Sequence, residues 1–166
     1  MAVLIAVPIL GILAVLQSAI VSTMPLLHGT ADIVLLALLG WALQERVTSA
    51  VQWALIGGLF MSIMSGLPVG AYLGSYLAAC IIARMIRQRV WKVPFLGMLA
   101  ATFTGTLIVL FAGWVSRWLS GVYIPILTAI NLIMLPAILL NLLLAIPSYF
   151  IMRDVAIWLH PIEIEP

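Results

Sequence analysis

The chain has 166 residues, of which 66% are hydrophobic and only 7% are charged, and its formal net charge is +2 at pH 7. A soluble domain carries roughly a quarter charged residues. This composition therefore excludes a soluble globular protein and predicts an integral membrane protein.

The amino-terminal third contains two apolar stretches. Residues 1–27 carry no charged side chain and predict a helix near 2–23. This stretch lacks a basic start and a small-residue cleavage site, so we interpret it as a retained helix and not as a removed signal peptide. A shorter apolar run from Ile33 to Leu43 predicts a second helix near 31–44.

The middle of the chain is uncharged for 37 positions, from residue 47 to residue 83. A bilayer core of about 30 Å needs about 20 helical residues, so this run is too long for one straight crossing. Its break is the segment SGLPVG, Ser65 to Gly70, because glycine and proline end one helix and start the next. We expect helices near 49–65 and 69–86.

The last third has uncharged runs at 93–116 and 118–152, which predict helices near 94–116 and 126–152. No linker or internal repeat interrupts the chain. The predicted fold is thus a single all-α transmembrane domain, residues 1–166, built as a bundle of six transmembrane helices.

The basic residues predict the orientation of this bundle, because Lys and Arg near helix ends mark the cytoplasmic side. Six spans with both termini in the cytoplasm place six of the seven basic residues inside and only Arg117 outside. Four of the six form one cluster: Arg84, Arg87, Arg89 and Lys92. We interpret this cluster as a topology anchor, with binding of anionic lipid or an acidic partner as the alternative.

The tryptophans are expected at the headgroup level, because all of them lie near predicted helix ends. They are Trp41, Trp53, Trp91, Trp114, Trp118 and Trp158.

Small residues recur every four positions on three consecutive predicted helices. The rows are Ala54, Gly58, Ser62 and Gly66; Gly70, Gly74 and Ala78; and Gly97, Ala101 and Gly105. Such rows let helix backbones approach closely within a membrane. Each row is a candidate either for packing inside the bundle or for a groove that accepts a helix of a partner.

Residues for catalysis are few. Cys80 is the only cysteine, and the five acids and two histidines show no metal-ligand spacing. No nucleophile–base constellation, phosphate-binding loop or basic stripe for nucleic acid is present. The sequence therefore predicts no enzyme, no catalytic or metal site, no cofactor and no nucleic-acid partner.

Three polar residues within apolar surroundings are functional candidates: Asp32, Asn131 and Asn141. An acid at membrane depth is a candidate by default, but Asp32 can also stabilise the start of a helix with Thr30 as the N-cap. The two asparagines lie on the last helix among Pro136 and Pro147, where their amides can bond to freed backbone or to a neighbouring helix.

Three segments resemble the MreD family of bacterial rod shape-determining proteins. They are ADIVLLALLGWAL, GGLFMSIMSGLPVGAYLGSYLAACIIARMIRQR and LPAILLNLLLAIPSYFIMR. Two positions depart from the family pattern. Ala31 stands where proline is usual before the acid, and Ser62 stands where many members carry an aspartate.

The resemblance implies a six-helix fold similar to the substrate-binding subunits of energy-coupling-factor transporters. It also implies a non-enzymatic scaffold of the elongasome in the bacterial cytoplasmic membrane, which helps to organise lateral peptidoglycan synthesis and cell shape. The implied partners are MreC and, through it, MreB, RodA and a class B penicillin-binding protein. The sequence leaves the oligomeric state open, a homo-oligomer included.

The alternative function is a substrate-binding membrane subunit of a vitamin-type energy-coupling-factor transporter. Such a subunit needs an outward pocket with convergent polar groups. The expected outer loops offer His28, Thr30, Arg117, Ser120 and Tyr123, with Asp32 alongside.

Overall fold

The computed structural model describes residues 2–19, 28–66, 68–89 and 93–159, and every regular element within them is helical. The elements are α1 (Ala2–Ala19), α2 (Ile33–Ala42), α3 (Ala50–Ser65), α4 (Val69–Arg89), α5 (Pro94–Leu119), α6 (Ile126–Ala129), the π-helical segment η2 (Ile130–Met134) and α7 (Leu135–Leu159). The last three form one continuous helix over 126–159. The expected all-α class is thereby confirmed.

The predicted break between α3 and α4 is confirmed and has a local cause. Gly66 ends α3 with a φ of 66°, a left-handed conformation that glycine adopts without steric cost. Pro68 then opens the next turn, where its carbonyl accepts a hydrogen bond from the Ala71 N–H at 2.9 Å. Pro94 starts α5 in the same way, because a first-turn residue needs no N–H.

Helix lengths differ from the prediction at several ends. α4 continues through Arg87 and Arg89, since arginine favours helix and a cation stabilises a helix carboxyl end. The final helix continues past Arg153 and Asp154, which form an exposed ion pair at 3.1 Å, to Leu159. The predicted end of the first helix, 20–23, lies outside the described residues.

Among the described helices, α4, α5 and the 126–159 helix are each long and apolar enough to cross a membrane. α1, α2 and α3 are shorter apolar helices. With ten residues, α2 is about 15 Å long, or half of the bilayer core.

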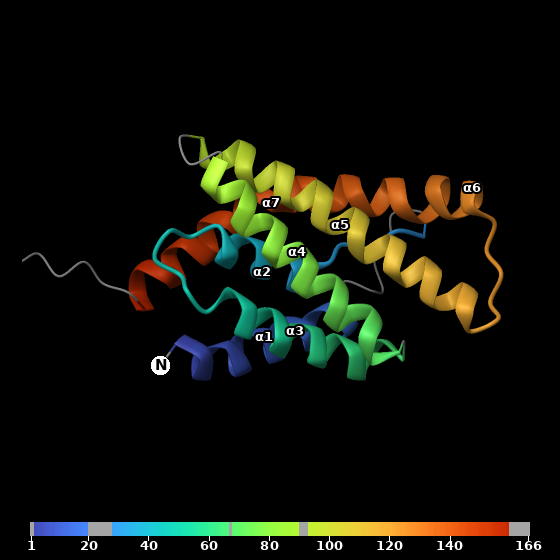
Figure 1. Ribbon diagram of the computed structural model, residues 1–166, viewed down its shortest axis with the longest axis horizontal. Helices are drawn as coiled ribbons and strands as arrows, with labels where there is room; N and C mark the ends of the chain where they lie inside the picture. Colours follow the sequence, from blue (N-terminus) through green and yellow to red (C-terminus); the bar gives the residue numbers. More distant parts are fainter. Residues whose placement is uncertain (1, 20–27, 67, 90–92, 160–166) are drawn as a thin grey trace, which may run out of the picture.

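α2 lies at the centre of the bundle, and the other helices surround it (Figure 1). α1 packs on α3, α4 lies between α3 and α5, and α7 covers α2 and α5. All residues from Val34 to Ala42 are buried. A helix that is apolar on every side is expected to be enclosed in this way.

The central position of α2 places two of the tryptophans inside the bundle. Trp41 and Trp53 are fully buried, and their rings stack with centroids 4.2 Å apart. Because α2 and the inner face of α3 do not reach the surface, these side chains fill the core. Trp118 and Trp158 are exposed, and Trp91 lies outside the described residues.

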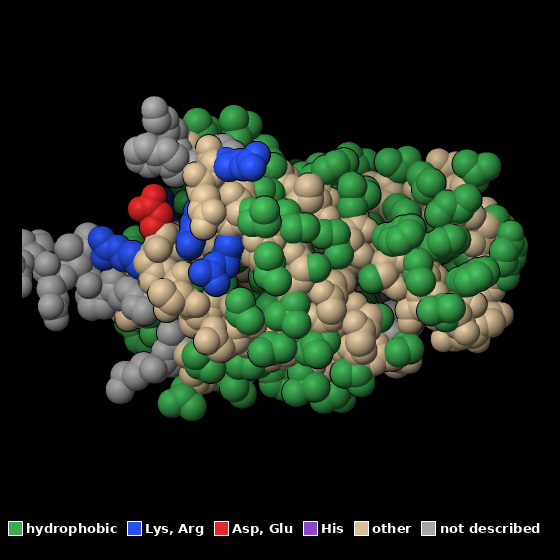
Figure 2. Space-filling model, in the orientation of Figure 1, with side chains coloured by type: hydrophobic (Ala, Val, Ile, Leu, Met, Phe, Trp, Pro, Cys, Tyr) green, Lys and Arg blue, Asp and Glu red, His purple; other side chains and the backbone are tan. Residues whose placement is uncertain are grey.

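Charged side chains gather at one end of the molecule on the face shown in Figure 2, and hydrophobic side chains are spread over the rest of that face. This end, where α4 and α7 finish and α5 begins (Figure 1), is the basic end. α5 finishes and α6 begins at the opposite end.

Candidate functional site

A polar network lies inside the bundle around the start of α2. Its side chains come from five elements: Gln17 on α1, Asp32 before α2, Tyr76 on α4, Thr106 on α5 and Asn141 on α7. Tyr76, Thr106 and Asn141 are almost completely buried. Such groups are costly inside an apolar bundle unless they bond to one another.

The Asp32 carboxylate is the centre of this network. The Tyr76 hydroxyl lies 2.8 Å from both carboxylate oxygens, so that its proton is shared between them. The Leu35 N–H donates to Oδ1 at 2.9 Å. Asp32 is therefore itself the N-cap of α2, and the expectation that Thr30 has this role is wrong. The cap satisfies a free N–H and places negative charge at the positive end of the helix dipole.

Other network members bond to two further backbone N–H groups at this helix start. The Asp32 N–H donates to Asn141 Oδ1 at 2.7 Å, and the Val34 N–H donates to Gln17 Oε1 at 3.0 Å. Asn141 Nδ2 in turn donates to Thr106 Oγ1 at 3.0 Å. A helix that begins inside the bundle has no water for its first N–H groups, and these side chains replace it.

The segment before Asp32 reaches this depth by docking on the last helix. Pro136 has no N–H, so the Leu132 carbonyl lacks its α-helical donor, and the His28 N–H bonds to it at 3.1 Å. The approach is close, since a methyl group on Gly29 would lie 2.5 Å from the Ala137 nitrogen. Glycine is therefore required here, next to the π-helical turn of η2.

The two predicted asparagines have different environments. Asn141 belongs to the polar network, whereas Asn131 is exposed in η2. Sequence reasoning missed Tyr76, Thr106 and Gln17. Their only signal was a polar atom within an apolar helix, which many residues in this chain share.

Two of the rows of small residues face other helices. On α3, Ala54, Gly58 and Ser62 are buried, and a methyl group on Gly58 would lie 2.9 Å from the Leu73 Cα of α4. The Ser62 hydroxyl lies 2.7 Å from the Gly58 carbonyl and 3.0 Å from the Val69 carbonyl. Gly66, at the end of this row, is exposed and ends the helix.

The α5 row is also buried: Gly97, Ala101 and Gly105. A methyl group on Gly105 would lie 3.1 Å from Leu39 Cδ1 and 3.3 Å from Ala79 Cβ. These contacts bring α5 against both α2 and α4. Packing inside the bundle therefore accounts for this row.

The α4 row differs. Gly70 and Gly74 are exposed and Ala78 is partly buried, and beyond the adjacent backbone of α4 no described atom would lie within 4 Å of a methyl group on either glycine. The inward face of α4 carries Tyr76, Cys80 and their buried neighbours instead. The α4 row thus forms an open face of the bundle.

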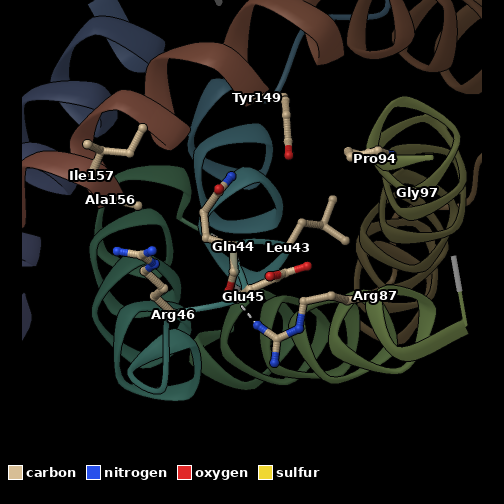
Figure 3. Close-up of a pocket in the computed structure, with 10 residues that line it drawn as sticks. All are labelled: Leu43, Gln44, Glu45, Arg46, Arg87, Pro94, Gly97, Tyr149, Ala156 and Ile157. Atoms are coloured by element: carbon tan, nitrogen blue, oxygen red, sulfur yellow. Dashed lines mark hydrogen bonds between the residues drawn. The ribbon is translucent and has the colours of Figure 1, made fainter. Parts of the chain in front are cut away.

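The basic cluster has one structural member and lies beside a cavity of about 220 Å³. Arg87 donates from Nη1 to the carbonyl oxygens of Ala42 and Gln44, so it caps the carboxyl end of α2 (Figure 3). Arg84 is partly buried, Arg89 is exposed, and Lys92 lies outside the described residues. In Figure 3, the Tyr149 hydroxyl points into this cavity towards Leu43.

A second cavity, of about 250 Å³, lies towards the opposite end and is called the opposite-end cavity. It is lined by the polar residues His28, Thr30, Tyr72 and Arg117, and by apolar residues of α5, α6, η2 and α7. Three of the residues expected in an outer pocket, His28, Thr30 and Arg117, therefore meet here. Ser120 and Tyr123 do not line it; the Ser120 hydroxyl bonds to the Ser116 carbonyl at 2.9 Å.

Comparisons of the chain with protein-family models, with curated proteins and with solved structures give no match. The three segments quoted above therefore carry the resemblance to MreD by themselves.

Proposed function

We propose that this protein is a non-enzymatic, multi-pass scaffold of the MreD type in a bacterial cytoplasmic membrane. In this proposal it binds an MreC-like membrane protein and, through it, the MreB, RodA and class B penicillin-binding protein assembly. In this proposal the basic end and both termini lie on the cytoplasmic side, in keeping with the positive-inside rule. The chain crosses the membrane six times, and α2 together with residues 28–32 before it makes one of these crossings.

The observation that carries this proposal is a contrast between two parts of the molecule. The polar groups in the interior bond to one another, whereas one face of α4 is open. The polar atoms around Asp32 bond to one another and to the start of α2. We interpret these bonds as support for the fold. The α4 row offers Gly70 and Gly74 without a neighbour among the described residues, as helix docking in a membrane requires.

The opposite-end cavity bears on the alternative function, a vitamin-binding transporter subunit. Its volume of about 250 Å³ is smaller than the roughly 300–1,000 Å³ of typical small-molecule pockets. The cavity is thus small for a typical small-molecule site, which supports the scaffold over the transporter subunit.

The test is depletion of the protein in its rod-shaped host, together with recovery of the protein in mild detergent. We expect the depleted cells to become round and an MreC-like protein to co-purify with the chain. Cells that remain rod-shaped, together with tight binding of a vitamin-sized ligand by the purified protein, would favour the transporter subunit.

A further inference from the structure

The opposite-end cavity contains hydrogen-bond donors that have no acceptor among the side chains and backbone that the structure describes. Among the described residues, no hydrogen-bond partner exists for the hydroxyl groups of Thr30 or Tyr72. Arg117 donates one bond, from Nη1 to the Gly113 carbonyl of its own helix at 3.3 Å, and its other N–H groups have no acceptor in the described part of the chain. The cavity thus presents unused donors from α4, α5 and the segment before α2.

The charge in this cavity has one sign. The ionisable side chains at its wall are Arg117, His28 and Tyr72, and no described acid lines it. Asp32 is the neighbouring acid, but both of its carboxylate oxygens face the Tyr76 hydroxyl. A hydroxyl group can donate its hydrogen bond equally well to water or to an anion. A guanidinium, in contrast, binds most strongly to an oxyanion that accepts hydrogen bonds from two of its N–H groups.

The remaining walls are apolar. They include Val109 and Leu110 of α5 and Ile133, Met134 and Ala137 of the last helix. From Val109 to Arg117 the cavity follows α5 for about 12 Å, at 1.5 Å per residue. Arg117 and Trp118 lie near the helix end and are exposed, so the cation is at the level where lipid headgroups are found.

We propose that the opposite-end cavity binds an oxyanion, the phosphate of a phospholipid headgroup, through Arg117, Tyr72 and Thr30, with the first carbons of the lipid against the apolar wall. This site does not depend on the scaffold function. The same donors would also accept free phosphate, so the experiment has to separate the two sources.

The experiment measures lipid retention by native mass spectrometry of the purified full chain. The probes are phosphatidylglycerol, diacylglycerol with the same acyl chains, and inorganic phosphate. We expect retention of phosphatidylglycerol and not of diacylglycerol, and little competition by millimolar inorganic phosphate. Arg117→Gln should weaken retention by about tenfold or more, and Tyr72→Phe by several-fold, because each removes donors to the phosphate.

Two controls are matched to these variants. Arg153→Gln makes the same change of charge at the basic end, outside the basic cluster, and Tyr123→Phe removes an exposed hydroxyl outside the cavity. Neither should change retention. Thermal unfolding of every variant separates a loss of ligand from a loss of fold, and Tyr72→Phe remains informative if Arg117→Gln does not fold.

Three results would overturn the proposal. Equal loss in Arg117→Gln and Arg153→Gln would mean that only net charge matters. Equal retention of diacylglycerol would remove the role of the phosphate. Displacement of phosphatidylglycerol by millimolar inorganic phosphate would show that the ligand is a soluble oxyanion and not a lipid.

Discussion

The rows of small residues on α3 and α4 have the same four-residue spacing and opposite environments. A methyl group on Gly58 of the α3 row would approach the Leu73 Cα to 2.9 Å, whereas a methyl group on Gly74 of the α4 row would meet no described atom within 4 Å beyond the adjacent backbone of α4. The spacing therefore predicts that one face of a helix carries only small side chains, but it does not predict what packs against that face. The position of α4 in the bundle decides this, because its other face already packs against the core.

The largest expected effect concerns the inward face of α4, which carries Tyr76. Tyr76→Phe removes the hydroxyl shared by both oxygens of Asp32, and hydrogen bonds to charged groups contribute about 1.5–3 kcal/mol. We expect a loss of stability of this size, measured by unfolding in detergent. Tyr123→Phe, at a side chain that is 75% exposed, is the control and should have no effect. An equal effect of both changes would contradict the network.

The next effect concerns the α3 row. Gly58→Ala should destabilise the protein by a net amount of about 1–2 kcal/mol, because overpacking against the α4 backbone exceeds the gain of about 0.5–1 kcal/mol in helix propensity. The measurement is again detergent unfolding. A stabilised Gly58→Ala variant would mean that α3 and α4 are further apart than described.

The same substitution in the α4 row should have the opposite sign. Gly74→Ala gains helix propensity without a clash, so we expect it to stabilise the isolated protein by about 0.5–1 kcal/mol. Because both glycines lie inside helices, the pair isolates the effect of the environment. Destabilisation by Gly74→Ala would place a neighbour on this face.

Much of the fold could be predicted from the sequence because glycine and proline residues mark where its helices end and start. Gly66, Pro68 and Pro94 end or start helices through their own backbone geometry. The site could be predicted only in part. Asp32 and Asn141 stood out as polar residues in apolar surroundings, but their partner Tyr76 is ordinary in a membrane helix.

The tryptophans show why burial was harder to predict. Trp41 and Trp53 lie near helix ends, as residues at a membrane surface do, yet they stack inside the bundle. The decisive fact is that α2 is enclosed on all sides, which depends on contacts between distant segments. One example is the hydrogen bond from the His28 N–H to the Leu132 carbonyl. This carbonyl can accept it because Pro136, one helical turn later, has no N–H to donate. Local sequence does not specify such contacts.

The most direct test of the scaffold is Gly74→Leu in the rod-shaped host. Leucine on an open, apolar face should not destabilise the isolated protein; like Gly74→Ala, it should stabilise it by about 0.5–1 kcal/mol through helix propensity. It should nevertheless block the close approach of a partner helix and reduce co-purification of the MreC-like protein. Loss of the partner with stability intact is the predicted result. Unchanged co-purification, with stability not reduced, would show that this face of α4 meets only lipid and would contradict its role as the docking face.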